Sequence, residues 1–191
     1  EALSPEERGR LLSAGYKDLA AKIAAHDRLG PLMEETDIPL IPVLVDMEKN
    51  GIGCHISELQ TLASDLSERL AGIEEEIALR GGERINLNSP KQVAWLLFEK
   101  LGLPAGKKTK TGYSTDISVL EGLSAMGAPF DDVPNLLIEY RELAKMLSGF
   151  VHPLEKSASE GEGTIHGVFE PAVTGTGRLS SRDPNLQNLP S

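Results

Sequence analysis

SELQTLASDLSERLAGIEEEIALR (residues 57–80) has apolar residues that recur at steps of three and four along the chain. This spacing places side chains on one face of an α-helix. The stripe consists of Leu59, Leu62, Ala63, Leu66, Leu70, Ile73 and Ile77. Gly81 and Gly82 follow it, as is typical of a helix end. The predicted helix is about 35 Å long at 1.5 Å per residue, and its apolar face needs a partner.

A second apolar stripe runs through residues 134–156 and is predicted to be that partner. Its members are Leu137, Tyr140, Leu143, Ala144, Leu147, Val151 and Leu154. Two long antiparallel helices would form a stalk that carries the intervening residues 86–126 at its end. A long stripe is equally compatible with a coiled-coil arm that binds another protein. Both alternatives stay open at this point.

Residues 86–126 are predicted to form a helical tip of two short helices joined by a lysine- and threonine-rich loop. Ser89 and Gln92 have the spacing of a capping box at the start of the first helix. Ser114 or Thr115 is expected to cap the second. Two helix N-termini would therefore lie close to a cationic loop, and free N–H groups at helix N-termini are natural phosphate sites.

The charge of the chain is unevenly distributed. The formal net charge is −10, which argues against a general nucleic-acid binder. Residues 86–116, in contrast, hold five lysines against two acidic residues, a local charge of +3. Lysines attract phosphate without sequence preference. The alternative is that Lys107, Lys108 and Lys110 are simply solvated.

The segment TGTGRLSSRDPNLQNLP (residues 174–190) is too polar to belong to a core. Its glycines and prolines are predicted to fix a rigid loop that displays hydrogen-bonding side chains. The minor groove of a duplex offers acceptors at similar positions for every base pair, so an arginine such as Arg178 could probe pairing there without reading sequence. A plain polar surface loop is the alternative.

The remaining segments predict few further elements. We expect two short helices in residues 1–36, a helix at residues 38–50 followed by Gly51, and a short strand within residues 161–173. Leu179 is expected in the hairpin partner of that strand. With one cysteine, Cys54, no internal disulfide is possible, and a reducing, cytoplasmic setting is expected. No apolar run has the length of a membrane span.

Three segments resemble family A DNA polymerases, the bacterial DNA polymerase I type. TGTGRLSSRDPNLQNLP is similar to the family pattern T-A-T-G-R-L-S-S-x-D-P-N-L-Q-N-I-P, where the thumb crosses into the palm. NLNSPKQ and the lysine-rich loop after it resemble the tip of the thumb. YRELAKMLSGF (residues 140–150) resembles Y-R-x-L-x-K-L-K-S-T-Y, with Leu147, Gly149 and Phe150 as departures. Glu170-Pro171 also departs from the family's usual Asn-Gln.

The resemblance implies a mainly α fold with a small β hairpin: a long antiparallel helix pair with a helical tip, followed by the first strands of an α+β palm. It implies three parts: the tail of an exonuclease-like domain or linker at 1–36, the thumb at 37–156 with its tip at 86–126, and the start of the palm at 157–191.

The resemblance also implies that the chain grips the backbone and minor groove of primer–template duplex DNA. The implied DNA-binding residues are Asn88, Ser89, Lys107, Lys108, Lys110, Ser114, Thr115, Arg141, Lys145, Ser148, Arg178, Asn185, Gln187 and Asn188. For Arg141 and Lys145, ion pairing with Glu139 or Glu142 on the helix surface is the alternative.

The parent is expected to be a DNA-directed DNA polymerase, a nucleotidyltransferase of replication and repair that uses Mg²⁺ and dNTP. This piece is expected to lack the catalytic aspartates, to hold no metal and to be inactive alone. Asp183 is interpreted as a cap, and Asp131-Asp132 as a helix start. A monomer without membrane contact is expected. A helical protein-interaction module and an inactive polymerase relative remain the alternative functions.

Overall fold

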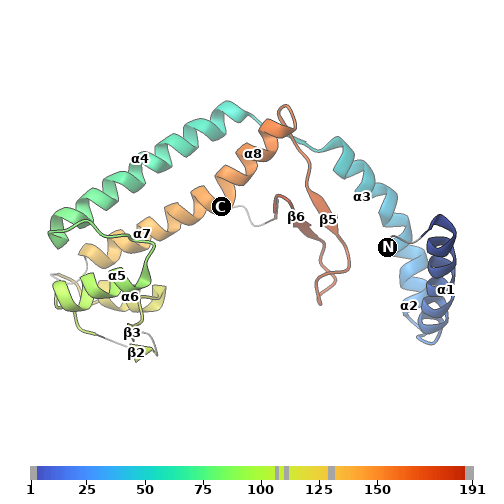
Figure 1. Ribbon diagram of the computed structural model, residues 1–191, viewed down its shortest axis with the longest axis horizontal. Coiled ribbons are helices and arrows are strands. Elements are labelled where there is room, and N and C mark those ends of the chain that lie inside the picture. Colours follow the sequence, from blue (N-terminus) through green and yellow to red (C-terminus); the bar gives the residue numbers. More distant parts are fainter. Residues whose placement is uncertain (1–3, 106–107, 110–111, 129–131, 188–191) are drawn as a thin grey trace. The chain divides into compact units, whose positions relative to one another are not determined.

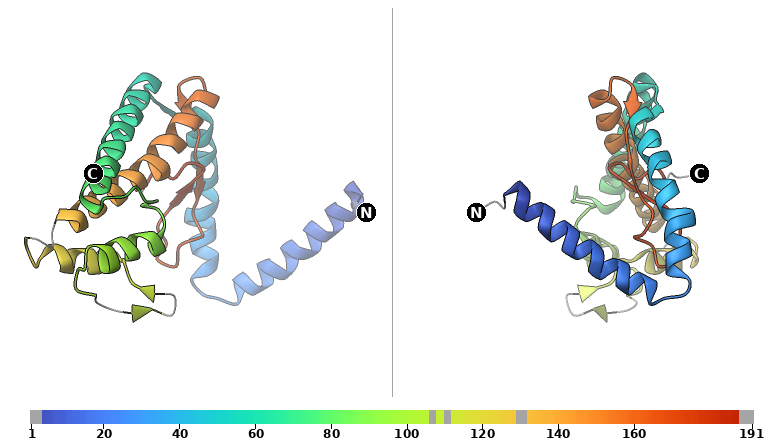
Figure 2. Two further views of the ribbon diagram at one scale, coloured as in Figure 1. Left: turned by 60° about the vertical axis from the view of Figure 1, so that its left-hand side comes forward. Right: turned by 90° about the vertical axis from the view of Figure 1, so that its right-hand side faces the viewer.

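The computed structural model describes residues 4–105, 108–109, 112–128 and 132–187. It divides into two compact units (Figures 1 and 2). The stalk unit comprises Ile52–Ile165 with Pro184–Ser191, and the N-terminal unit comprises Glu1–Gly51 with His166–Asp183. Each unit is described by itself.

The two predicted long helices exist and pack against each other within the stalk unit. Helix α4 spans Ile56–Gly81, and Gly82 ends it with a left-handed φ of 73°. The returning helical run consists of α7 (Asp132–Met146), the π-helical segment η3 (Leu147–Val151) and α8 (His152–Glu160). Figure 1 shows this run antiparallel to α4, and all three of its parts contact α4. The intramolecular alternative is therefore confirmed.

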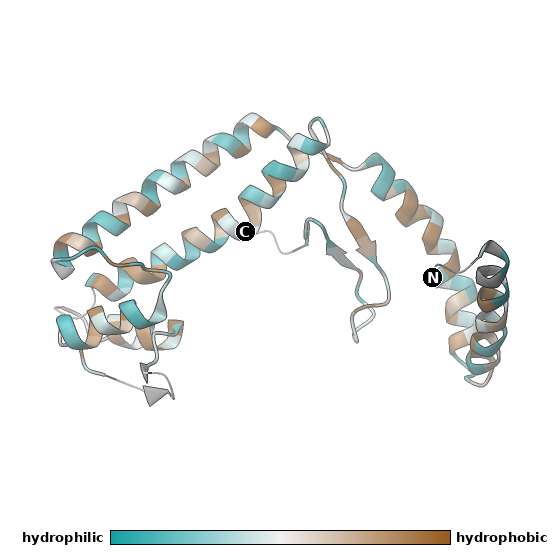
Figure 3. Ribbon diagram, in the orientation of Figure 1, coloured by the Kyte–Doolittle hydropathy of each residue, from teal (hydrophilic) through white to brown (hydrophobic). Residues whose placement is uncertain are grey.

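The core of the stalk unit is concentrated where α4 and α7 meet the tip. Ile73 and Ile77 of α4 and Leu137 of α7 are at most 1% exposed. Each fully buried aliphatic side chain of this size contributes about 1.5–3 kcal/mol to folding. Farther along α4, Leu62 is 41% exposed. Figure 3 shows apolar and polar residues alternating along both helices. The apolar stripe of α4 is thus more deeply buried near the tip than at Leu62 farther along the helix.

The tip consists of two helical segments and a hairpin. Helix α5 (Pro90–Ala94) continues into the π-helical η2 (Trp95–Lys100), and α6 spans Ile117–Ser124. Strands β2 (Lys108–Thr109) and β3 (Gly112–Tyr113) pair antiparallel where the sequence predicts only a loop. The views of Figures 1 and 2 place the hairpin beyond the tip helices.

The caps of the tip helices differ in detail from the prediction. Ser89 is the N-cap of α5, as predicted, but its side chain makes no capping bond. Gln92 does not close a capping box: its Oε1 accepts from the backbone N–H of Asn86 at 2.7 Å. The N-cap of α6 is Asp116, whereas Ser114 and Thr115 precede it. Gln92 thus bonds back to the loop before α5, and the hydroxyl of Ser114 accepts from the backbone N–H of Asp116.

The opposite end of the stalk is closed by a two-residue strand pair. Strands β1 (Ile52–Gly53) and β4 (Thr164–Ile165) pair antiparallel, with Ile52 opposite Ile165. The turn after α8 is tight, because a Cβ placed on Gly161 would lie only 1.9 Å from the carbonyl oxygen of Thr164. Only glycine fits this approach of two backbone segments.

The N-terminal unit contains helices α1 (Pro5–Ala24), α2 (Leu29–Leu32) and α3 (Ile38–Asn50), with the π-helical η1 (Met33–Asp37) between the last two. The predicted bounds of the helix at residues 38–50 are confirmed. Strand β5 (Val168–Glu170) pairs with β6 (Ser180–Arg182). The predicted strand within residues 161–173 is therefore split between β4 and β5. Strand β5 ends before Pro171, which lacks an N–H for a further ladder bond.

Glu48 of α3 anchors the start of β5. Its carboxylate accepts from the backbone N–H of Phe169 at 2.8 Å, and its carbonyl oxygen lies 2.8 Å from Nδ1 of His166. Within the described part of the chain, no helix is long and apolar enough to cross a membrane.

Candidate nucleic-acid interface

Consecutive residues of α7 bind the two loops that lead into the tip helices. Arg141 donates from Nη1 to the carbonyl oxygen of Thr115, and from Nη2 to the hydroxyl Oγ1 of Thr115 at 3.1 Å. The alternative, ion pairing of Arg141 with Glu139 or Glu142, is not seen among the described contacts, and Glu139 is bound by Arg69. Arg141 therefore ties α7 to the entry of α6.

The electrostatic setting of Arg141 follows from its position between two elements. Its side chain is half-buried, and this burial lowers the pKa of the guanidinium, while the nearby carboxylate of Asp116 opposes the shift. The group stays charged, because an arginine pKa far exceeds neutral pH. Arg141 is therefore a half-buried cation on α7 that is held against Thr115 of the tip.

Tyr140, one residue earlier, binds the other loop. Its hydroxyl accepts from Nδ2 of Asn88 at 3.2 Å and donates to Oε1 of Glu74 at 3.0 Å. The residue is 5% exposed. Burial raises the pKa of the Tyr140 phenol, and the hydrogen bond to the Glu74 carboxylate adds to the rise. One hydroxyl thus joins α4, α7 and the entry of α5.

The predicted contact residues on the tip differ in exposure. Asn88 is exposed and Ser89 is half-exposed, so both present side-chain atoms at the surface. Ser114 and Thr115 are 6% and 5% exposed. The hydroxyl of Ser114 accepts from the backbone N–H of Asp116 at 3.2 Å. The hydroxyls of Ser114 and Thr115 therefore serve the fold of the loop before α6.

Two further predicted residues lie on the helical run beyond Arg141. Lys145 is exposed on α7, one turn from Arg141 and hence on the same face. Ser148 is exposed in η3 and donates its hydroxyl to the carbonyl oxygen of Ala144 at 2.7 Å. Lys107, Lys110 and Asn188 lie outside the described residues, and Lys108 is described only by its backbone in β2.

Arg178 lies in the connection between β5 and β6 of the N-terminal unit. Its side chain is exposed, and its carbonyl oxygen accepts from the hydroxyl of Thr174 at 2.6 Å. Asp183 is ion-paired with Arg182 and has a positive φ of 54°. It caps no helix here: its carboxylate serves this pair, which corrects its interpretation as a cap.

Asn185 and Gln187, which belong to the stalk unit, are exposed and form a local turn. The side-chain oxygen of Asn185 accepts from the backbone N–H of Gln187 at 3.0 Å. Such Asx turns hold short polar segments in one conformation. This bond shapes the segment locally, and the rigidity of the whole loop stays a prediction.

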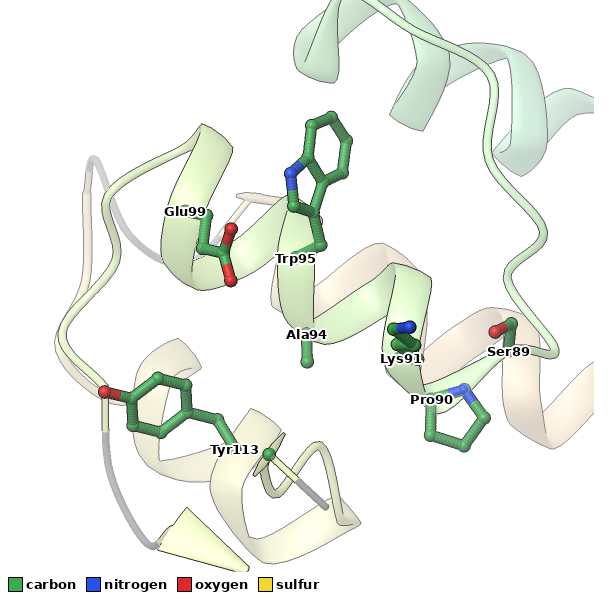
Figure 4. A pocket seen from close by; sticks show the side chains of 8 residues that line it. Ser89, Pro90, Lys91, Ala94, Trp95, Glu99 and Tyr113 are labelled. Carbon is green, nitrogen blue, oxygen red and sulfur yellow. The ribbon is translucent and has the colours of Figure 1, made fainter.

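A cavity of about 560 Å³ lies beside the start of α5 (Figure 4). It is lined by Ser89, Pro90, Lys91, Ala94, Trp95, Glu99, Gly112 and Tyr113. In Figure 4 the side chain of Tyr113 approaches from β3, while those of Lys91, Ala94 and Glu99 project from the tip helix. The wall combines aromatic, cationic, anionic and hydroxyl groups, and it includes Ser89, one of the predicted DNA-binding residues.

Sequence reasoning missed the roles of Tyr140 and Glu74. Tyr140 entered the prediction as one member of an apolar stripe and as the first residue of the segment 140–150, without a role for its hydroxyl. A usable signal existed, because a buried tyrosine hydroxyl needs a hydrogen-bond partner. No group of three or more His, Cys, Asp or Glu that could hold a metal occurs among the residues that the structure describes.

Comparison with known proteins gives consistent matches. The model of the family described as DNA polymerase family A matches residues 56–191. DNA polymerase I of Bacillus subtilis (strain 168) is 41% identical over 172 residues, which cover 90% of this chain and 19% of that protein. DNA polymerase I of Geobacillus stearothermophilus is 42% identical over 159 residues, covering 83% and 18%. The chain spans about a fifth of the length of these curated relatives.

A solved structure shares the fold. The POL domain of Pol1 from M. smegmatis, in complex with DNA primer-template and dNTP, matches with a TM-score of 0.80 and 34% sequence identity. The match covers 91% of this chain and 30% of that one. Since the family model spans most of the chain and the fold agrees, the chain belongs to DNA polymerase family A.

Proposed function

We propose that this chain is the DNA-gripping thumb, with the start of the palm, of a DNA-directed DNA polymerase that acts in replication and repair. The observation that carries the proposal is the pair of contacts from α7, in which Tyr140 and Arg141 hold the entries of α5 and α6 side by side. Family membership and the DNA-bound state of the M. smegmatis structure support it.

The proposed grip acts on the sugar–phosphate backbone. Asn88 and Ser89 offer polar groups at the entry of α5, and Lys107, Lys108 and Lys110 add positive charge in the sequence that follows η2. Such contacts fix position on a duplex and carry no sequence information, as a general polymerase requires. Ser114 and Thr115 support this grip indirectly, because their hydroxyls hold the loop before α6 in place. Lys145 and Ser148 extend the grip along the helical run.

The proposed palm segment inspects base pairs. Arg178 donates into the minor groove, where acceptors occupy similar positions in every base pair. Asn185, Gln187 and Asn188 bind the template or primer nearby. The exposure of Arg178, Asn185 and Gln187 supports this role.

Nucleotidyl transfer belongs to the whole parent. Mg²⁺ would supply charge stabilisation and activate the primer oxygen there. The described residues of this chain do not fit such a site, because Asp183 is paired with Arg182 and no group of three or more His, Cys, Asp or Glu among them could hold a metal. The dNTP site and the metal are therefore proposed for the parent.

The proposed domain assignment is an exonuclease-like tail or linker at 1–36, the thumb at 37–156 with its tip at 86–126, and the palm start at 157–191. A monomeric state and a cytoplasmic location are part of the same proposal.

Charge reversal at the tip tests the proposal. The variant Lys107→Glu, Lys108→Glu, Lys110→Glu should lose binding to a labelled primer–template duplex, because each lost phosphate contact weakens affinity and flattens its salt dependence. A variant with the same change in net charge, Lys17→Glu, Lys22→Glu, Lys156→Glu, is the control.

The control should retain most of its affinity, and both variants should keep their helical circular dichroism. Equal loss of binding in both variants would mean that net charge alone weakens binding, and it would overturn the proposed tip contact. Unchanged binding in the tip variant would do the same.

A further inference from the structure

The two segments of the tip that the proposed function places on DNA are held by neighbouring residues of one helix. Consecutive residues of an α-helix point about 100° apart. Tyr140 and Arg141 therefore reach different segments, the first Asn88 and the second Thr115. These segments lie 27 positions apart in sequence (88 and 115), so nothing local sets their spacing.

We propose that Tyr140 and Arg141 are positioning residues, which set the spacing of the two tip loops. For Arg141 this role is separate from the direct contact that the resemblance implies. The proposal rests on the proposed function only for its effect on DNA binding. The geometry of the tip is tested separately.

The bonding of Arg141 favours this role. Nη1 and Nη2 both donate to Thr115, one to the backbone and one to the side chain. The fork of a guanidinium matches two acceptors in one plane, and an ammonium group cannot reproduce that geometry. A half-buried group with two bonds to one residue fixes that residue in orientation as well as distance.

Tyr140 completes the arrangement from the other side. Its hydroxyl is donor to Glu74 and acceptor from Asn88, so it uses both of its hydrogen-bonding capacities within the protein. It is 5% exposed and packs in the core cluster beside Leu137. Removing the hydroxyl would release Asn88 while leaving the aromatic ring in the core.

The chain offers a matched control in Arg69 of α4. Its guanidinium forks onto the carboxylate of Glu139 on α7, with Nε–Oε1 at 2.7 Å and Nη2–Oε2 at 2.9 Å. This bridge joins the two stalk helices and touches neither tip loop. Arg69→Lys therefore loses a fork of the same kind and keeps the charge, as Arg141→Lys does.

The experiment measures amide hydrogen exchange and duplex binding for the full chain and for Arg141→Lys, Tyr140→Phe and Arg69→Lys. The informative amides are Leu120, which donates to Asp116, and Val93, which donates to Ser89. Arg141→Lys should speed exchange at Leu120, and Tyr140→Phe at Val93, each about tenfold, the effect of one lost hydrogen bond. Arg69→Lys should change neither.

Binding to the labelled duplex should weaken about tenfold in Arg141→Lys although the charge is kept. Its unfolding midpoint in urea should match that of Arg69→Lys, which separates positioning from general stability. If Arg141→Lys binds DNA as tightly as the unsubstituted chain, and the amide of Leu120 still exchanges as slowly, the proposal is overturned. If the amides respond as expected while no variant binds DNA, positioning stands and the proposed function fails.

Discussion

Tyr140 shows at the scale of one residue how burial and hydrogen bonding combine. Its hydroxyl lies between the carboxylate of Glu74 and the amide of Asn88, in a nearly closed environment. A neutral phenol suits this place, whereas a phenolate would lack solvation and face a carboxylate. The raised pKa of Tyr140 is therefore a consequence of the geometry.

The phenol of Tyr140 is expected to ionise above its ordinary value of 10.0. Because the folded pKa is raised, the stabilisation is fully present below pH 10 and is lost as the pH rises from there through the folded value. Near-ultraviolet absorbance of tyrosinate, taken as the difference between the chain and Tyr140→Phe, isolates this group. Ionisation of Tyr140 at or below its ordinary value would contradict the buried hydrogen-bond network.

At the scale of elements, the contact of α4 with α7 near the tip carries the stability of the stalk unit. Leu137→Ala removes a side chain that is 0% exposed, and we expect a loss of about 2–5 kcal/mol in the free energy of unfolding. Urea unfolding followed by circular dichroism measures it. Leu79→Ala is the control on α4, because Leu79 is 84% exposed.

The Leu79→Ala control should shift the free energy of unfolding by less than about 0.5 kcal/mol. Equal effects of the two substitutions would mean that α4 does not pack on α7 through the face described above.

The turn after α8 gives a second prediction. Replacing its Gly161 with alanine should lower the stability of the chain, whereas the same change at Gly72 in α4 should raise it. Gly161→Ala would bring a methyl group to 1.9 Å from a backbone oxygen that cannot move aside, and we expect a loss of about 1–3 kcal/mol. Gly72→Ala in α4 meets nothing within 4 Å and should stabilise by about 0.5–1 kcal/mol. Thermal unfolding of both variants distinguishes the cases, and a stable Gly161→Ala would contradict the tight turn.

Elements with a strong period could be predicted from the sequence, and contacts between distant segments could not. The helix at residues 38–50 and the end of α4 at Gly82 follow from local patterns and are confirmed. The hairpin β2–β3 has strands of two residues, too short to show alternation. The bond of Arg141 to Thr115 depends on how α7 packs against the tip, which no local pattern encodes.

At the scale of the molecule, an acidic chain is proposed to bind an acidic polymer at a few places. The net charge is −10, yet residues 86–116 carry +3. Local potential, not net charge, governs contacts shorter than the Debye length of about 8–10 Å. The domain assignment and the DNA-binding residues remain predictions that binding experiments on this chain test.

Titration of a labelled primer–template duplex with the full chain at several salt concentrations shows whether the chain grips DNA through its phosphates. The logarithm of the association constant should fall linearly with the logarithm of salt concentration, with a slope of about −0.9 for each phosphate neutralised. We expect measurable binding at low salt that weakens in this way. Absence of binding at the lowest salt, or binding that is independent of salt, would contradict it.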